Sequence, residues 1–326
     1  MSGPYRIVLR RTGGPEVLEV EPIDLPRPGP GEILIRQEAV GLNFIDVYHR
    51  TGLYPLPLPT GIGAEGAGLV EAVGEGVEEL RPGDRVVYVS RAIGAYASHR
   101  SIAADAAVKL PDGIDSELAA ATMLKGCTAE SLIERCARIE AGETVLVHAA
   151  AGGVGLILVQ WLKAIGATVI AHAGSPAKAQ LAQASGADQA LCCPLEGLAA
   201  EVRALTAGRG VDVVFDGVGA ASWAASLASV ARRGLIVSYG NASGPVPPLT
   251  VADLVAAGSI FLTRPAMFDY VATRPELERS TARLFEMIAS GAVKVEIGAR
   301  FGLREAADAH RAIEARSTTG STVLIP

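Results

Sequence analysis

Three closely spaced glycines, Gly152, Gly153 and Gly155, separate two apolar segments of different periodicity. Residues 145–147 form a short run typical of a buried strand, and residues 156–165 have the apolar pattern of a helix. A strand, a glycine-rich turn and a helix in this order are typical of a dinucleotide-binding unit, where the helix N-terminus presents backbone N–H groups to a pyrophosphate. The alternative is an ordinary βαβ unit whose turn happens to contain glycine.

The individual positions of this turn fit the first interpretation. Gly152 allows the backbone to approach phosphates, and Gly155 allows the helix and the strand to pack closely. Ala150 stands where the motif usually has its first glycine, so the pattern is A-x-G-x-x-G. Since the strand and helix that the motif requires are both present, we predict phosphate contacts from the turn, at Gly152, Gly153, Val154 and Gly155.

The end of the second strand of this unit bears on which dinucleotide is bound. An NAD-preferring site has Asp or Glu there to accept a hydrogen bond from the ribose 2′-OH, whereas this chain has Ala173. Ser175 is a good helix N-cap and Pro176 suits the first helical position. Lys178 then falls in the first helical turn, where a cation is unfavourable unless an anion is near. Ser175 and Lys178 therefore predict NADPH; the alternative is a solvated surface lysine.

Length and composition favour a two-domain enzyme without nucleic-acid or membrane partners. The chain has 326 residues, of which 49% are hydrophobic, and a net charge of −6 with no basic run. Its most apolar window is interrupted by polar residues and glycines, so we expect no membrane span. The N-terminal residues lack a signal-peptide segment, which predicts a cytoplasmic protein. Four cysteines show no disulfide or metal spacing: Cys127, Cys136, Cys192 and Cys193.

The chain changes character along its length. Short strands between Gly/Pro-rich turns predict a mostly antiparallel β domain early in the chain, at residues 5–9, 32–39, 66–73 and 84–88. Alternating helices and strands follow, at 117–123, 129–138, 211–215, 235–239 and 259–263. The tail has helices at 277–290 and 304–316, and a strand at 322–325 that we expect to rejoin the first domain. The predicted division is 1–122, completed by 266–326, for the β domain and 123–265 for the nucleotide domain.

Several segments together carry a family resemblance over the whole chain. They are 13–18 (GGPEVL), 41–48 (GLNFIDVY), 52–55 (GLYP), 61–68 (GIGAEGAG), 83–88 (GDRVVY), 124–128 (LKGCT), 148–155 (HAAAGGVG), 233–241 (RGLIVSYGN) and 320–326 (GSTVLIP). The chain resembles the zinc-independent quinone oxidoreductases, of the ζ-crystallin type, within the medium-chain dehydrogenases/reductases. The resemblance implies an α/β protein with a GroES-like β domain and a Rossmann doubly wound parallel sheet. It also implies NADPH and a homodimer that pairs sheet edges near residues 259–263.

The resemblance also implies roles for residues outside the glycine-rich turn. Asn43 and Tyr54 would line the space where nicotinamide and substrate meet. Further residues would contact the cofactor: Lys125, Thr128, Gly217, Tyr239, Gly240, Asn241 and Arg316. Alternative interpretations are that Tyr54 only fills a loop and that Asp46 caps a helix or joins a salt bridge rather than acting as a base. Family members often have Tyr where this chain has Cys193, near the adenosine end.

The same comparison of motifs argues against a metal. Zinc alcohol dehydrogenases of the superfamily have a Cys near Asn43 and a His directly before the position of Glu65. Here Ala64 precedes Glu65. No cysteine occurs before Cys127, and a catalytic zinc needs three protein ligands. His49 and His99 are isolated and are expected to be solvated, so we predict an enzyme without a metal.

These features favour one reaction over two alternatives. A simple alcohol needs a Lewis acid to lower the pKa of its hydroxyl, whereas an electron-poor quinone needs mainly orientation against the nicotinamide. We therefore expect NADPH-dependent reduction of a quinone. One alternative is reduction of α,β-unsaturated carbonyls. The other is a non-catalytic structural or RNA-binding role, against which the acidic balance and the 5% aromatic content argue.

Overall fold

The computed structural model describes residues 3–326, and it divides into two compact units. The β unit comprises residues 3–127, 271–285 and 295–326, and the nucleotide unit comprises residues 128–270 and 286–294. Met1 and Ser2, at the start of the predicted first domain, lie outside the described residues. The boundaries predicted from the sequence, 122/123 and 265/266, fall a few residues earlier and remain predictions. Two helices, α2 (Ser116–Glu130) and α9 (Arg274–Ala289), run across the boundaries.

The β unit is built from two sheets. A three-stranded sheet has the order β2-β1-β4, and a seven-stranded sheet has the order β15-β16-β3-β5-β6-β8, with β7 also paired to β3. The strands are β1 (Tyr5–Leu9), β2 (Leu18–Pro22), β3 (Glu32–Leu42), β4 (Thr60–Gly61), β5 (Glu65–Val73), β6 (Arg85–Val89), β7 (His99–Ala103), β8 (Ala107–Lys109), β15 (Ile297–Gly302) and β16 (Ser321–Ile325). All described pairs are antiparallel except β15 with β16, as the sequence predicts for most of this domain.

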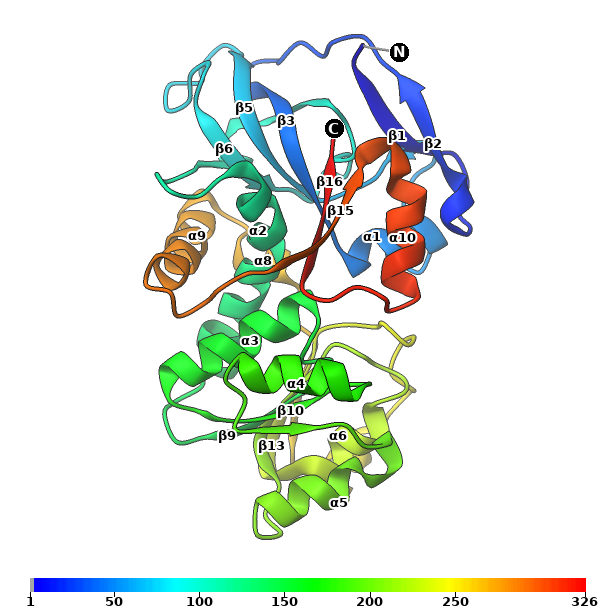
Figure 1. Cartoon of the computed structure of the whole chain (residues 1–326), viewed down its shortest axis with the longest axis vertical. Helices are drawn as coiled ribbons and strands as arrows, with labels where there is room; N and C mark the ends of the chain where they lie inside the picture. The colour runs from blue at the N-terminus through cyan, green and yellow to red at the C-terminus, as the bar shows by residue number, and fades with distance from the viewer. Residues whose placement is uncertain (1–2) are drawn as a thin grey trace. The chain divides into compact units, whose positions relative to one another are not determined.

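The C-terminal strand completes the large sheet of the β unit. β16 pairs with the end of β3, with Leu324 opposite Val40, so the expectation that the tail rejoins the first domain is confirmed (Figure 1). The core combines side chains from early and late segments, among them Ile35, Tyr96 and Leu303. The helical segments of this unit are η1 (Pro15–Val17), α1 (Phe44–Thr51), η2 (Ala104–Ala106), η4 (Leu303–Glu305) and α10 (Ala306–Glu314), with parts of α2 and α9.

A single parallel sheet forms the centre of the nucleotide unit. Its order is β11-β10-β9-β12-β13-β14, which is the 3-2-1-4-5-6 order of a Rossmann fold. The strands are β9 (Thr144–Val147), β10 (Thr168–His172), β11 (Gln189–Leu191), β12 (Val211–Asp216), β13 (Val230–Ser238) and β14 (Phe261–Thr263). The central strand β12 reads VDVVFD and is almost wholly buried, as expected for a strand covered on both faces.

Helices cover both faces of this sheet, with α3 and α4 on one side and α5 and α6 on the other (Figure 1). Leu198 of α5 and Trp223, the first residue of α6, pack against sheet residues such as Val214. The helix α3 ends at Gly166, whose φ of 93° is the left-handed conformation of a glycine C-cap. The helices are α3 (Gly153–Ile165), α4 (Pro176–Ala184), α5 (Leu195–Leu205), α6 (Trp223–Ser229), α7 (Val251–Ala256) and α8 (Met267–Tyr270).

One helical prediction is wrong. The sequence suggests two helices at residues 117–123 and 129–138, but α2 continues directly into a π-helical segment, η3 (Ser131–Ala137). Lys125 and Gly126 lie inside α2. Gly126 lies within the continuous helix, where its missing side chain leaves room for Leu284 of α9; the Leu284 Cδ1 would lie 2.3 Å from an added Cβ.

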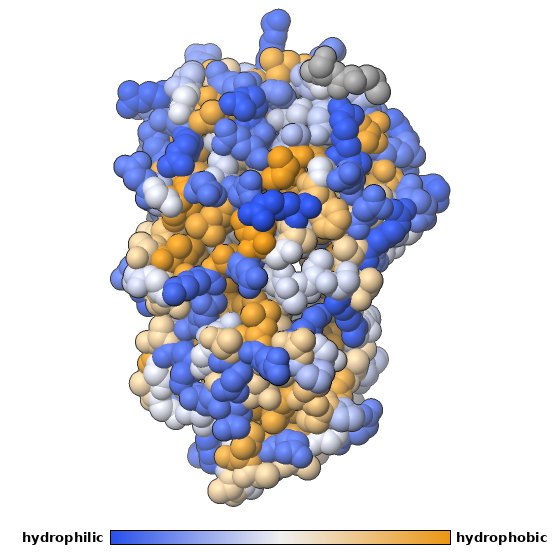
Figure 2. Space-filling model, in the orientation of Figure 1, coloured by the Kyte–Doolittle hydropathy of each residue, from blue (hydrophilic) through white to orange (hydrophobic). Residues whose placement is uncertain are grey.

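The surface of the β unit and the lengths of the helices bear on the expectation of no membrane span. In Figure 2 the visible face of the β unit is mostly hydrophilic, with hydrophobic side chains scattered between the polar ones, which is ordinary for solvent-facing surface. No helix among residues 3–326 combines the length and the apolar character that a membrane crossing requires.

The close packing of α3 on its preceding turn predicts a contrast between two helical glycines. A Cβ at Gly155 would lie 2.4 Å from the carbonyl oxygen of Ala149, whereas a Cβ at Gly197 in α5 would meet nothing within 4 Å. Gly155→Ala should therefore lower the free energy of unfolding by about 1–3 kcal/mol. Gly197→Ala should leave it unchanged or raise it by roughly 0.5–1 kcal/mol. Urea unfolding of both variants tests this; equal stabilities would contradict the role assigned to Gly155.

Candidate dinucleotide site and polar networks

The glycine-rich turn joins β9 to the N-terminus of α3. Gly152 is the N-cap, so Gly153, Val154 and Gly155 form the first helical turn, where backbone N–H groups have no partner within the helix. The Ala150 N–H donates to the carbonyl of His172 at 3.1 Å, which ties the turn to the end of β10. The four predicted phosphate-binding residues are thus together at the carboxyl edge of the sheet, where dinucleotides bind in this fold.

The segment after β10 lies at the same edge. Ser175 caps α4, because its Oγ accepts a hydrogen bond from the Lys178 N–H at 3.3 Å, and Pro176 is the first helical residue. The predicted cap is confirmed. Lys178 is half-buried in the first turn, and Ala173 is buried at the strand end where NAD-preferring proteins have an acid.

The ends of β12 and β13 bring a third set of predicted residues together. A Cβ on Gly217 would lie 2.7 Å from the Tyr239 ring, and a Cβ on Gly240 would lie 2.3 Å from the carbonyl oxygen of Gly217. The Asn241 carbonyl accepts from the Gly244 N–H at 2.9 Å. At Gly240 backbone meets backbone, whereas Gly217 leaves room for the Tyr239 ring. Gly217, Tyr239, Gly240 and Asn241 occupy the carboxyl edge as one group.

A buried carboxylate that the sequence prediction missed holds this loop. Asp216 Oδ1 accepts from the N–H groups of Val218 and Gly219, at 2.8 and 3.1 Å. The hydroxyls of Ser222 and Ser226 donate to its Oδ2, at 2.8 and 2.6 Å. An acid directly after a buried apolar strand and before a glycine was the available sequence signal.

His148 extends the Asp216 network. Its Nε2 lies 3.0 Å from Ser226 Oγ, whose single hydrogen points to Asp216, so Nε2 must be the donor. Burial lowers the pKa of His148 to about 4, the His172 ring lowers it as well, and the Asp216 charge opposes both. At neutral pH the ring is therefore neutral and acts as a fixed donor.

In the β unit, Asn43 and Lys125 share one acceptor. Asn43 Nδ2 donates to Glu65 Oε1 at 2.6 Å, and Lys125 Nζ lies 3.4 Å from the same oxygen. Asn43 and Lys125 are each 5% exposed, and Glu65 is fully buried. The structure thus joins a predicted substrate-side residue to a predicted cofactor-side residue through a carboxylate outside the predicted set.

Asp46 connects this group to a second buried cluster. Its Oδ2 accepts from the Asn43 N–H at 2.9 Å, which confirms the helix-cap interpretation, and from the Tyr96 hydroxyl at 3.1 Å. His310 Nε2 lies 3.1 Å from the same hydroxyl. Burial raises the pKa of Asp46 to about 7, helped by the Glu65 charge, and burial lowers the pKa of His310 to about 3.

The remaining predicted residues are Tyr54, Arg316 and Thr128. Tyr54 is half-buried and packs edge-on against Tyr48, with ring centroids 5.2 Å apart. Arg316 is exposed just after α10, with a φ of 55°. Thr128 is the first residue of the nucleotide unit, and its carbonyl accepts from the Ser131 hydroxyl at 2.8 Å. Their predicted roles remain predictions.

One histidine prediction is wrong. His49 is only 7% exposed, because α1 turns it inward against the Tyr54 ring, and burial lowers its pKa. His99 is half-buried and lies 3.6 Å from Glu71. Within residues 3–326 no three His, Cys, Asp or Glu side chains gather in a way that would hold a metal ion. The absence of zinc remains a prediction based on Ala64 and the cysteine-free N-terminal region.

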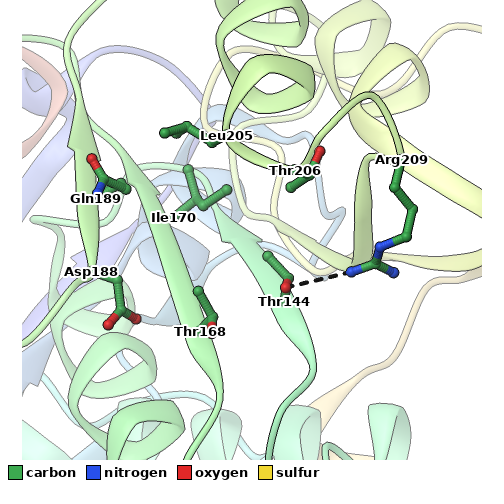
Figure 3. A pocket seen from close by; sticks show the side chains of 8 residues that line it. All are labelled: Thr144, Thr168, Ile170, Asp188, Gln189, Leu205, Thr206 and Arg209. Carbon is green, nitrogen blue, oxygen red and sulfur yellow. Dashed lines mark hydrogen bonds between the residues drawn. The ribbon is translucent and has the colours of Figure 1, made fainter.

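A hollow of about 230 Å³ marks the other edge of the parallel sheet. Figure 3 shows Thr144 and Thr168 there, with Arg209 Nη2 3.5 Å from Thr144 Oγ1. Both threonines are the first residues of their strands. Because dinucleotides bind at the carboxyl ends of the strands, this hollow is separate from the candidate site.

Comparisons with known proteins agree with this architecture. Residues 29–112 match the family model of the alcohol dehydrogenase GroES-like domain, and residues 153–279 match that of the zinc-binding dehydrogenases. A quinone oxidoreductase of Pseudomonas aeruginosa is 48% identical over 98% of this chain and 99% of that protein. A 2-haloacrylate reductase of a Burkholderia species is 38% identical over 98% of both proteins.

A solved structure supports the same assignment. The crystal structure of Escherichia coli quinone oxidoreductase complexed with NADPH is 45% identical, with a TM-score of 0.96 over 99% of this chain and all of that chain. The predicted combination of a GroES-like β domain and a Rossmann domain is confirmed. The chain therefore belongs to the quinone oxidoreductase family of the medium-chain dehydrogenases/reductases, and it is an oxidoreductase.

Proposed function

We propose that this protein reduces quinones with NADPH. The observation that carries the proposal is the carboxyl edge of the parallel sheet, where a glycine-rich helix N-terminus lies beside a second helix that begins with Ser175 and Lys178. Relatives named as quinone oxidoreductases, one of them solved with NADPH, support both the cofactor and the substrate class.

The residues present fit NADPH. The first turn of α3 supplies backbone donors for a pyrophosphate, and Gly217 and Gly240 add no side chains of their own to the neighbouring loop edge. Lys178 supplies a cation for a 2′-phosphate, and the buried Ala173 places no competing carboxylate at the strand end. Cys193 follows β11, and its carbonyl oxygen lies 3.0 Å from His172 Nε2. Family members often have a tyrosine at this position, where this chain has the smaller cysteine side chain. Bound NADPH supplies a hydride equivalent at the nicotinamide.

On the substrate side, we assign the residues to orientation. Asn43 would hydrogen-bond nicotinamide or substrate, and Tyr54 would position the acceptor, since a quinone is electron-poor without a Lewis acid. The 2-haloacrylate reductase relative favours an α,β-unsaturated carbonyl as the second candidate substrate, because both substrates require the same orientation at a nicotinamide.

We also propose a homodimer through the edge of the parallel sheet. The strand order of the nucleotide unit ends at β14, and an edge strand presents backbone groups for pairing. Phe261 in β14 is 64% exposed, and Val251 and Val255 in α7 are 80% and 65% exposed. Apolar side chains next to an unpaired edge favour burial against a second copy. The cytoplasmic location stays a prediction from the sequence.

The cofactor proposal predicts a selective defect for Lys178→Glu. A charge-assisted hydrogen bond to the phosphate stabilises binding by ~1.5–3 kcal/mol, so the NADPH KM should rise roughly tenfold or more, with little change for NADH. A glutamate in the first turn of α4 is favourable to the helix, so the loss would not reflect unfolding. Lys294→Glu is a charge-matched control on an exposed side chain of the same unit. Equal use of both cofactors by the wild-type protein would refute the proposal.

The substrate proposal predicts a partial defect for Tyr54→Phe. The ring should keep its contact with Tyr48, while loss of a positioning hydrogen bond costs ~0.5–1.5 kcal/mol, a several-fold drop in kcat/KM with NADPH binding nearly intact. Tyr54→Leu removes the ring as well and should be worse. Initial rates are compared for a benzoquinone, an enone and a primary alcohol. Complete inactivity of Tyr54→Phe would indicate an essential proton donor and the enone reaction; turnover of the alcohol alone would exclude both.

The dimer proposal predicts that Phe261→Glu yields monomers. A charge would be buried unpaired in the interface, which opposes association. Leu205→Glu serves as the control, because Leu205 is also exposed, at 43%, but lies at the end of α5. Sedimentation velocity of the three proteins distinguishes the outcomes: a wild-type monomer, or a dimer that Phe261→Glu leaves intact, would contradict the assigned interface.

A further inference from the structure

Glu65, the first residue of β5, is a fully buried carboxylate that contacts one backbone N–H and two polar side chains. Oε1 accepts from Asn43 Nδ2 at 2.6 Å and lies 3.4 Å from Lys125 Nζ. Oε2 accepts from the backbone N–H of Leu124 at 2.6 Å. Both oxygens therefore face donors, and all four residues belong to the β unit.

The neighbouring backbone is shaped around this carboxylate. A Cβ on Gly41 would lie 2.1 Å from Glu65 Oε1 and 2.3 Å from the carbonyl oxygen of Ala120. The glycine of β3 thus leaves the space that the carboxylate occupies between β3 and α2. Because Leu124 and Lys125 are consecutive in α2, the carboxylate also fixes that helix turn against the strand.

Stability alone does not explain a buried ion pair at this place. Desolvation of two charges offsets much of their attraction, and apolar replacements of buried pairs are often as stable. The bonds nevertheless select one geometry. An amide has one donor end and one acceptor end, and the bond to Glu65 fixes which end of Asn43 points to β5. The same oxygen holds the Lys125 ammonium near that amide.

We propose that Glu65 is a positioning residue that orients the Asn43 amide toward the reacting groups and the Lys125 ammonium toward the cofactor. This inference rests on the function proposed above for Asn43 and Lys125. Glu65 itself contacts neither substrate nor cofactor in this role. Glu65 would affect kcat through Asn43 and the NADPH Kd through Lys125.

The principal test is Glu65→Gln, analysed in two double-mutant cycles. The glutamine amide must turn an NH2 group either toward Leu124 N–H or toward Asn43 and Lys125, so at least one hydrogen bond is lost. Hydrogen bonds to charged groups predict that kcat falls and the NADPH Kd rises, each roughly tenfold or more. In an Asn43→Ala background the kcat effect should disappear, and in a Lys125→Met background the Kd effect should disappear.

A control and a second variant keep the test decisive. Glu32 accepts from Gly29 N–H and Ser101 Oγ, at 2.9 and 2.8 Å, in the same unit, and Glu32→Gln should change neither parameter. Glu65→Asp keeps the charge beside Lys125 but withdraws the carboxylate by one methylene, so it should lower kcat even if Glu65→Gln fails to fold.

The outcomes separate this inference from the proposed function. If Glu65→Gln causes losses of equal size in the wild-type protein and in the Asn43→Ala and Lys125→Met backgrounds, its role is merely structural and the inference is overturned. Wild-type kcat and Kd in Glu65→Asp would overturn it as well. A wild-type protein that binds NADPH but reduces no quinone would refute the proposed function. In that case the NADPH Kd of Glu65→Gln, measured by fluorescence titration without substrate in the wild-type and Lys125→Met backgrounds, would still decide the role of Glu65.

Discussion

The close approach of backbone to backbone at the carboxyl edge of the parallel sheet is the constraint on which the nucleotide unit depends. At Gly155 the first turn of α3 meets the Ala149 carbonyl, and at Gly240 one strand end meets the Gly217 backbone. A side chain at any of these positions would push the elements apart by more than a packed interior tolerates. Under the proposed function, the glycines that allow this packing would also allow phosphates to approach the backbone N–H groups of the first turn of α3.

Two buried acids hold neighbouring backbone and side chains in one position. Asp216 ends β12 and accepts from two backbone N–H groups and two serine hydroxyls. Glu65 begins β5 and accepts from one backbone N–H and two side chains. In both cases several donors replace the water that the carboxylate loses, which is what makes a buried charge tolerable. The donors are then held at fixed positions, as a binding edge requires.

The sequence predicts this fold well where the signal is local. The run at 145–147 followed by glycines gives the β9 turn and α3, and Ser175 with Pro176 gives the start of α4. The prediction fails where tertiary packing decides. Two helices are expected at 117–123 and 129–138, but α2 is continuous through Gly126, which packs against Leu284 of α9. His49 is expected to be solvated, but it is buried and its ring lies against that of Tyr54, a tertiary contact that the local pattern does not reveal.

The polar networks are the part that local patterns could not predict. Glu65 and Lys125 are 60 residues apart, and His148 and Ser226 are 78 apart, so no periodicity relates them. The sequence carries a steric counterpart for one of these networks: Gly41 makes room for the Glu65 carboxylate, whereas Gly217, directly after Asp216, makes room for the Tyr239 ring. Gly41 and Glu65 are far apart in the sequence, and the pairing of β3 with β5 is what brings this glycine and this acid together.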